Sequence, residues 1–455
     1  MWDLRRAAQA VGAELIRPRA PLRASGASCH SREVRPGDVF VALVGRRHDG
    51  HDFLAEAFSQ GAVGALVARD PGVGHNLLLV DDVRRALWEL ASWRREQLPI
   101  PFVGVAGSYG KTTAKELLGA ALGVRYRVFR ARASYNTEVG VPLEILSVPQ
   151  DAEVAVLELG EEAPGDIARL TQLVQPWAGL ITGVGEAHLA SLGDREGVAD
   201  VLWELAQALP EEGVLALNWD APELRARAAS CCGVCLRFGS APPAEFFPHG
   251  VAGDLPEGVR FRAATPRGEV EVELSLLGEH VATLACGALA LAWGLGVPEA
   301  AAAPALKWVQ PLPHRLQLLP APFGWILDDS YNANPLSVRA ALRTLMSLRL
   351  PVQRRVALLG DMLDLGPQEE KFHREMVQEA SWQGVDALFA FGPRMCRAFS
   401  AWEGEGAAEP EDLSALLGEL RREVARVPTL LLVKGSRGMA LERAVEALLE
   451  PQGSG

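Results

Sequence analysis

The most constraining feature of this chain is a short glycine-rich segment that joins a predicted strand to a predicted helix. It reads Gly107-Ser108-Tyr109-Gly110-Lys111-Thr112-Thr113 and follows the apolar run Phe102-Val103-Gly104-Val105. Glycines let backbone N–H groups converge on phosphate oxygens, and the first turn of the following helix adds partial positive charge. Lys111 can neutralise the β- and γ-phosphates, and Thr112 can ligate Mg²⁺. The segment therefore predicts a phosphate-binding loop on an α/β sheet.

The motif is a short form of the usual phosphate loop. A complete Walker A pattern would have glycine at position 105, where this chain has Val105. Lys111 is nevertheless one of only five lysines, among 45 lysine and arginine residues in total. A lysine inside the turn is informative in a chain whose usual cation is arginine. We therefore favour a phosphate loop over an ordinary strand-to-helix turn.

Apolar β-branched runs alternate with amphipathic stretches along the whole chain, which is the pattern of parallel sheets covered by helices. A chain of 455 residues also exceeds the size at which one hydrophobic core keeps growing. We expect an α/β protein of three domains, 1–98, 99–310 and 311–455, with junctions near Pro99 and Pro311. The first should be a small α/β domain, the second a P-loop domain with a mostly parallel sheet, and the third a Rossmann-like unit.

The central segment also contains one stretch of alternating apolar and charged residues and one long stretch without charge. The alternation from Glu269 to Leu274 predicts an antiparallel strand that extends the central sheet. The stretch from Val281 to Val297 has no charged residue and nearly the length of a membrane span, but alanine and glycine dominate it. We expect this stretch to form a buried helix rather than a membrane span.

The charge and the cysteine content exclude several classes of function. The formal net charge of -12 disfavours binding to phosphate backbones, so no nucleic-acid partner is expected. Six cysteines are scattered through the chain, and the CxxC pattern of Cys232 and Cys235 lacks the second pair that a zinc ribbon needs. Residues 1–23 contain no uninterrupted apolar core of a signal peptide. We expect a cytoplasmic monomer with reduced cysteines and no membrane insertion.

The motifs of the central segment, taken together, resemble the Mur ligase family. After the phosphate loop come the segments Ser134 to Pro142, Glu158-Leu159-Gly160 and Glu186-Ala187-His188, in the same order as in the central domain of that family. The resemblance implies a domain that uses ATP and Mg²⁺ to form an acyl phosphate from a carboxylate. It also implies that Glu158 and His188 join Thr112 as metal ligands.

Motifs in the other two segments extend the resemblance over nearly the whole chain. The third segment contains DDSYNANP at 328–335, LGDMLDLG at 359–366 and VKGSRGM at 433–439. These motifs are similar to those of the family member that adds D-alanyl-D-alanine, and the segments at 31–38 and 49–53 agree with it. The resemblance therefore implies UDP-N-acetylmuramoyl-tripeptide and D-alanyl-D-alanine as substrates, with the first domain binding the UDP end.

The resemblance also assigns a role to each candidate residue. The implied catalytic set is Lys111, Glu158, His188, Arg315 and Lys434. The implied nucleotide contacts are Gly107, Ser108, Tyr109, Gly110, Lys111, Thr112 and Thr113 of the loop, with Asp329, Tyr331 and Asn332 of the third domain. The implied contacts to the UDP-linked substrate are Ser31, Arg32, Asp49, His51, Asn136 and Thr137. Closure of the third domain over the second would complete the site.

Simpler structural roles compete with several of these assignments. His188 follows a predicted strand and would also serve as a hydrogen-bonded core residue. The segment from Ser330 to Asn334 precedes a proline and would also serve as a helix cap, although capping does not need the two aspartates before it. Ser31 and Asp49 would also fit a solvated loop. We favour the functional assignment in each case.

Two positions depart from the family pattern. The family has a carbamylated lysine after the metal-binding histidine, which helps to hold a second Mg²⁺, and the matching position here is Leu202. A carboxylate from elsewhere in the chain would have to reach this ion, or the ion would bind more weakly. The family also has an asparagine that contacts adenine where this chain has Val281. The favoured interpretation is a divergent but active ligase.

Two other functions remain open at this point. One is another Mur-type or folylpolyglutamate-synthetase-like amide ligase, which would share the phosphate loop and the chemistry. The other is a catalytically idle nucleotide-binding subunit. The N-terminal segment argues against a folylpolyglutamate-synthetase-like enzyme, and the joint retention of Lys111, Thr112, Glu158, His188 and Lys434 argues against an idle subunit.

Overall fold

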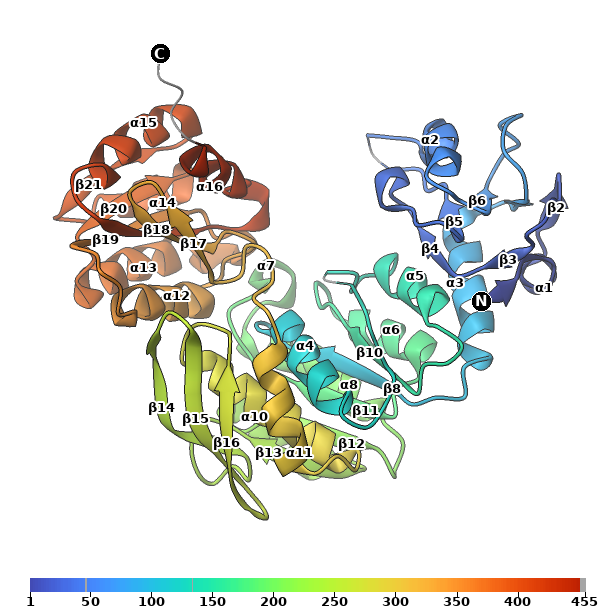
Figure 1. Ribbon diagram of the computed structural model, residues 1–455, viewed down its shortest axis with the longest axis horizontal. Helices are drawn as coiled ribbons and strands as arrows, with labels where there is room; N and C mark the ends of the chain where they lie inside the picture. The colour runs from blue at the N-terminus through green and yellow to red at the C-terminus, as the bar shows by residue number, and fades with distance from the viewer. Residues whose placement is uncertain (46, 133, 451–455) are drawn as a thin grey trace.

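The chain folds into three α/β domains that follow one another in sequence. The computed structural model describes residues 1–45, 47–132 and 134–450. The central domain lies between the N-terminal domain, drawn in blue, and the C-terminal domain, drawn in orange and red (Figure 1). Each domain has its own sheet, as expected from the sequence. The junctions near Pro99 and Pro311 fall between the last element of one domain and the first strand of the next, and the exact boundaries stay predictions.

The N-terminal domain contains a five-stranded sheet of order β2-β7-β6-β5-β4 and a separate β1-β3 pair. Neighbours in the larger sheet are parallel except β2 and β7. The strands are β1 Trp2–Asp3, β2 Glu14–Ile16, β3 Arg23–Ala24, β4 Gly26–Ser28, β5 Asp38–Val41, β6 Gly64–Val67 and β7 Leu77–Leu79. The helices are α1 Leu4–Ala10, η1 Ser31–Glu33, η2 Gly50–Phe53, α2 Leu54–Ser59 and α3 Val83–Glu96.

The central domain is built on a six-stranded, fully parallel sheet of order β13-β12-β11-β8-β10-β9. Helices cover both faces, which explains why its inner strands are continuous apolar runs. The strands are β8 Phe102–Ala106, β9 Val128–Arg130, β10 Val154–Glu158, β11 Ala178–Ile181, β12 Val214–Asn218 and β13 Val234–Phe238. The helices are α4 Lys111–Leu122, α5 Gly140–Ser147, α6 Asp166–Val174, α7 Leu189–Leu192, α8 Arg195–Gln207, α9 Pro222–Arg227, η3 Ala228–Ser230, α10 His280–Gly294, α11 Glu299–Ala302 and η4 Ala303–Trp308.

The predicted antiparallel strand near Glu269 exists, but it does not extend the central sheet. It is β16 Gly268–Leu274, and it pairs with β15 Gly258–Thr265, which in turn pairs with β14 Phe247–Leu255. These strands form a separate three-stranded sheet. The expectation was wrong because alternation indicates that one face of a strand is buried, but it does not identify the strand's partner.

The C-terminal domain has a six-stranded sheet of order β17-β18-β22-β19-β20-β21, in which only β17 runs antiparallel to its neighbour. This is the predicted Rossmann-like unit. The strands are β17 Gln317–Ala321, β18 Gly324–Asp329, β19 Arg354–Gly360, β20 Ala387–Phe391, β21 Glu405–Glu409 and β22 Thr429–Lys434. The helices are α12 Pro335–Ser347, η5 Gly366–Gln368, α13 Glu369–Gln383, α14 Pro393–Phe399, α15 Leu413–Val424, η6 Arg437–Met439 and α16 Glu442–Leu449.

Helix α3 ties the N-terminal domain firmly to the central one. Its Trp88 indole N–H donates to the Glu138 carbonyl at 2.7 Å, and the buried Arg94 donates to the Val148 carbonyl at 2.9 Å. The Trp2 indole adds a third bond to the Leu146 carbonyl at 3.0 Å. All three acceptors lie in or beside α5, so these two domains share one packed and hydrogen-bonded boundary.

Helix α10 is the buried helix that the uncharged stretch after Val281 predicts. Most of its residues are fully buried, and it packs between the central sheet and the three-stranded sheet. In the part of the chain that the structure describes, no helix combines the length and the apolar character that a membrane crossing requires. The α10 core therefore joins the two sheets of the central domain.

Shortening Leu289 to alanine should destabilise the central domain strongly. Leu289 is fully buried in the α10 core, and the resulting cavity should lower the free energy of unfolding by about 2 to 5 kcal/mol. Urea denaturation followed by circular dichroism measures this change. The control is Val124→Ala, since Val124 is 46% exposed and its truncation should change the free energy by no more than about 0.5 kcal/mol. Equal effects of the two substitutions would contradict this description of the core.

Candidate active site

Three parallel strands of the central sheet bring the candidate residues to one edge. Strand β8 leads into the phosphate loop, β10 ends at Glu158, and β11 is followed by the segment that contains His188. Because β10 and β11 flank β8 from opposite sides, this edge is a topological switch point. Open α/β sheets bind their ligands at such points. The order of the strands thus places the predicted metal and phosphate residues around one location.

The glycines of the phosphate loop are required by close packing. Gly107 has φ +140°, and a Cβ there would lie 1.9 Å from the Thr182 hydroxyl oxygen. Gly110 has φ +68°, and its Cβ would lie 2.7 Å from Leu284. The Thr182 hydroxyl in turn donates to the Tyr109 carbonyl at 2.5 Å. The loop is therefore held tightly against Thr182, which directly follows β11.

Two loop residues differ in what their side chains offer to a ligand. The Ser108 hydroxyl is buried and has no hydrogen-bond partner among the described residues. The Tyr109 hydroxyl packs over Gly183 and accepts from the Asn218 amide at 3.4 Å. Burial raises the pKa of Tyr109 to about 12. The Tyr109 hydroxyl thus already has a partner inside the protein, whereas the Ser108 hydroxyl at the loop has none among the described residues.

Lys111 opens α4 and is surrounded by oxygens. Its Nζ donates to the Gly107 carbonyl at 2.5 Å and to both oxygens of Glu161, at 3.0 and 2.9 Å. Burial raises the pKa of the Glu161 carboxyl, while the nearby Lys111 and His188 act in the opposite direction. Glu161 was not among the candidate residues. Its only sequence signal is a second acidic residue shortly after the strand that ends at Glu158.

Glu158 is held in place by two neighbours. The Thr112 hydroxyl donates to its Oε2 at 2.8 Å, and the Asn136 amide donates to its Oε1 at 2.8 Å. Glu158 is 2% exposed, and a buried carboxylate needs such partners. Asn136, expected at the UDP-linked substrate, thus lies beside the predicted metal ligands. Thr137 accepts from the Gly140 amide at 3.3 Å at the start of α5.

The hydroxyl and carboxylate donors suit Mg²⁺ better than a softer metal. His188 adopts a left-handed backbone conformation, φ 52°, at the start of α7, near Glu161. Among the described residues, no three His, Cys, Asp or Glu side chains form a preassembled metal cage. Mg²⁺ rarely uses such cages, because it binds through one or two carboxylates together with phosphates and water. Thr112 and Glu158, which the structure brings together, therefore fit a metal that arrives with a nucleotide, and His188 as a third ligand stays a prediction.

The C-terminal residues form a second cluster at the carboxyl ends of β18 and β22. Lys434 Nζ donates to Asp329 Oδ2 at 2.5 Å and to the Asn332 carbonyl at 2.9 Å. Arg315 lies over the Tyr331 ring, with its guanidinium carbon 4.1 Å from the ring centre, and Arg437 lies at 5.6 Å from the same centre. The predicted residues Arg315, Asp329, Tyr331, Asn332 and Lys434 are thus brought together.

Two contacts join this cluster to the central domain. The Asn334 amide donates to the Ser108 carbonyl at 3.2 Å, and the Tyr331 hydroxyl is hydrogen-bonded to the Ser134 hydroxyl. Asn334 also accepts from the Ser337 amide as the N-cap of α12. The predicted helix cap therefore exists, and the same side chain contacts the phosphate loop. Asn334 was not among the candidate residues.

The N-terminal candidates lie apart from the phosphate loop. Ser31 donates to Glu56 at 2.5 Å, and Arg32 is largely exposed. The buried His51 ring uses both nitrogens, Nδ1 with Asp49 at 2.6 Å and Nε2 as acceptor from the Ala68 amide at 3.0 Å. The backbone N–H of His51, together with its ring, lowers the pKa of Asp49. His51 thus orients a charged Asp49, which is partly exposed.

The two positions that depart from the family pattern are both apolar core positions. Leu202 is fully buried in α8, and Val281 is 4% exposed at the start of α10. The acidic residues near Leu202 are occupied elsewhere: Asp200 pairs with Arg227 at 2.5 Å, and Glu204 accepts from the Gly165 and Ala168 amides at 2.9 and 2.7 Å. Position 202 and these flanking acids thus supply no ligand to the site.

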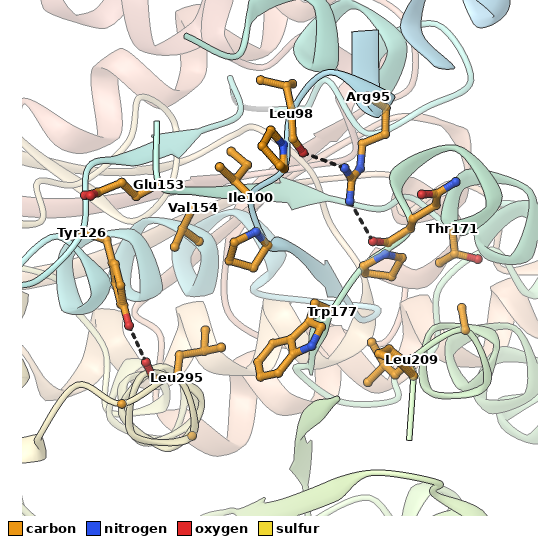
Figure 2. Close-up of a pocket in the computed structure, with 18 of the residues that line it drawn as sticks. Arg95, Leu98, Ile100, Tyr126, Glu153, Val154, Thr171, Trp177, Leu209 and Leu295 are labelled. Atoms are coloured by element: carbon orange, nitrogen blue, oxygen red, sulfur yellow. Dashed lines mark hydrogen bonds between the residues drawn. The ribbon is translucent and has the colours of Figure 1, made fainter. Parts of the chain in front are cut away.

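A large cavity lies at the opposite edge of the central sheet. It has a volume of about 1290 Å³, and Pro101, Val154, Trp177 and Pro210 place it at the amino ends of the strands (Figure 2). Arg95 and Tyr126 line it, but their side chains donate hydrogen bonds to backbone carbonyls. Because the phosphate loop follows the carboxyl end of β8, this cavity is not the candidate active site.

The fold and the site together define a class of three-domain proteins. In this class a central P-loop domain faces a Rossmann-like domain, and both carry cationic and carboxylate side chains where they face each other. Family models describe two of the domains, the Mur ligase middle domain over residues 105–292 and the Mur ligase glutamate ligase domain over residues 314–437. A curated Bacillus subtilis protein, UDP-N-acetylmuramoyl-tripeptide--D-alanyl-D-alanine ligase, is 35% identical over 93% of each chain. The chain belongs to the Mur ligase family, in the group that contains this relative.

Solved structures agree over the full length. MurF from Acinetobacter baumannii superposes with a TM-score of 0.86 at 28% identity, covering 99% of both chains. MurF from Thermotoga maritima, solved in complex with ADP, has a TM-score of 0.76 at 28% identity and covers 94% of this chain and 97% of that one. The similarity thus includes the N-terminal domain, which neither matching family model describes.

Replacing Asn334 with aspartate should loosen the phosphate loop without removing the helix cap. Aspartate caps helices as well as asparagine does, but it cannot donate to the Ser108 carbonyl. Loss of one hydrogen bond of about 1 kcal/mol should speed hydrogen exchange of the amides at 107–113 by roughly fivefold. Mass spectrometry of peptides that cover the loop measures this rate.

The matched control is Ser337→Ala, which weakens the same cap but does not touch the loop. It should lower the melting temperature slightly and leave exchange at 107–113 unchanged. Unchanged loop exchange in Asn334→Asp would show that the Asn334 contact does not restrain the loop.

Proposed function

We propose that this chain is an ATP-dependent ligase that joins D-alanyl-D-alanine to UDP-N-acetylmuramoyl-tripeptide in peptidoglycan precursor synthesis. The observation that carries the proposal is the arrangement of Lys111, Thr112 and Glu158 at the switch point of the central sheet. The relatives support the substrates, since the name of the Bacillus subtilis protein states this reaction and the match covers 93% of each chain. We place the enzyme in the cytoplasm as a monomer.

The loop residues fit a nucleotide phosphate chain. Gly107 and Gly110 leave no space for a side chain, so their amides can approach phosphate oxygens closely. The unsatisfied Ser108 hydroxyl would gain a partner from such a ligand. Thr112, Glu158 and His188 would hold Mg²⁺, which neutralises charge on the β- and γ-phosphates when bound. These residues support ATP as the co-substrate.

The proposed reaction has two steps. First, the terminal carboxylate of the tripeptide attacks the γ-phosphorus of ATP, so ADP leaves and an acyl phosphate forms. Next, the amine of D-alanyl-D-alanine attacks the acyl carbon, and inorganic phosphate leaves as the amide forms. Both steps depend on positioning and charge neutralisation, which Lys111, Arg315 and Lys434 would supply.

Each domain contributes to this proposal. Asp329, Tyr331 and Asn332 would contact the nucleotide from the C-terminal domain, which already touches the loop through Asn334. Ser31, Arg32 and Asp49 would contact the UDP end, with His51 orienting Asp49. Asn136 would act through Glu158, to which it donates, and Thr137 would act at the start of α5, where it accepts from the Gly140 amide.

Phosphate release tests the proposal directly. ATP, Mg²⁺ and UDP-N-acetylmuramoyl-tripeptide are combined with and without D-alanyl-D-alanine, and inorganic phosphate is measured over time. Sustained release should require both substrates, and Lys111→Ala should reduce it by about 100-fold or more, because a cation at the transferred phosphoryl group is lost. Nucleotide binding without phosphate release, for every tripeptide and acceptor tried, would instead support an idle nucleotide-binding subunit.

A further inference from the structure

Glu161 is a buried acid whose role the proposed reaction does not yet explain. Its side chain is 1% exposed, and both of its oxygens accept from Lys111. It lies in the turn after β10, on the phosphate-loop side of the sheet. A buried carboxylate costs free energy, so it persists only where an opposite charge compensates it. In the ligand-free chain, Lys111 provides that charge.

Binding of a nucleotide changes this balance. Lys111 is the cation that a phosphate loop directs at the β- and γ-phosphates, so one ammonium group would then face two sets of negative oxygens. Like charges repel strongly where water is excluded. A second cation beside Glu161 would relieve the repulsion, and a divalent metal ion that binds together with the nucleotide can supply that charge. Glu161 would therefore gain a compensating charge from a metal ion that binds with the nucleotide.

Other acids around this part of the fold are already occupied. Glu158, bonded to Thr112 and Asn136, is the proposed ligand of the first Mg²⁺. Asp200 and Glu204 on α8 are bonded to Arg227 and to the start of α6, and Leu202 between them is an apolar core residue. Glu161 differs from these acids in two ways. It is buried beside the phosphate loop, and its partner Lys111 must turn toward the nucleotide.

We propose that Glu161 is a ligand of a second Mg²⁺ that binds together with the γ-phosphate. The inference rests on the proposed function and identifies a residue of this chain that provides the second negative ligand. Mg²⁺ commonly takes one carboxylate and completes its shell with phosphate and water. Two-metal sites stabilise both the attacking and the leaving oxygens of a phosphoryl transfer.

A simpler role for Glu161 makes a different prediction. If Glu161 only anchors Lys111, then its loss should disturb the loop and weaken the nucleotide with or without metal. If Glu161 holds a metal, then its loss should leave metal-free nucleotide binding intact, or strengthen it, because Lys111 is released. Only the metal role changes the number of bound ions.

The experiment counts Mn²⁺ ions, which substitute for Mg²⁺ and are visible by electron paramagnetic resonance. The full-length protein is titrated with Mn²⁺ in the presence of a non-hydrolysable ATP analogue, and binding of the analogue alone is measured with EDTA present. The variants are Glu161→Gln, which removes the charge, and Glu161→Asp, which keeps it. The control is Glu162→Gln, an exposed acid next in the chain. Melting curves with and without the analogue check folding.

Wild type and Glu162→Gln should bind about two Mn²⁺ per chain, and Glu161→Gln about one tight ion. The weaker ion should lose roughly 10- to 100-fold in affinity, with partial recovery in Glu161→Asp. Two equally tight ions in folded Glu161→Gln would overturn the inference and leave the ligase proposal intact. If wild type bound no Mn²⁺ with the analogue, the proposed function would itself fail.

Discussion

The parallel pairing of β8 with β10 on one side and β11 on the other is the constraint on which the site depends. Parallel strands end at the same edge, so the phosphate loop, Glu158 and the segment that contains His188 start from one edge although they are far apart in sequence. The glycines then fix how closely the loop approaches Thr182 and Leu284. Without that edge, the same residues would be unrelated polar groups on three loops.

Charge is arranged in the same way in both domains that face the site. Lys111 is held by Glu161 in the central domain, and Lys434 is held by Asp329 in the C-terminal domain. Each pair buries a cation beside an acid, which costs desolvation free energy that a surface pair would not. The benefit is orientation, because both ammonium groups are fixed at strand or helix ends before any anion arrives.

Local patterns predicted most of the fold, since strand periodicity, the glycine turn and the uncharged α10 stretch are all properties of neighbouring residues. Pairing between distant segments was harder. The alternation near Glu269 identified a strand but not its sheet, and nothing local revealed that Asn334 reaches Ser108 or that Asn136 orients Glu158. Glu161 was missed because its importance comes from the fold, which turns it toward Lys111.

The three hydrogen bonds between the N-terminal segment and the α5 region have a mechanical consequence. Trp2, Trp88 and Arg94 anchor the N-terminal domain at buried or partly buried positions, whereas the C-terminal domain meets the loop through short polar contacts. Hinge motion concentrates where few packed contacts must break. The N-terminal and central domains therefore form one unit, which carries the phosphate loop and the predicted UDP-binding surface, and a rotation of the C-terminal domain against this unit would move Lys434 relative to the loop.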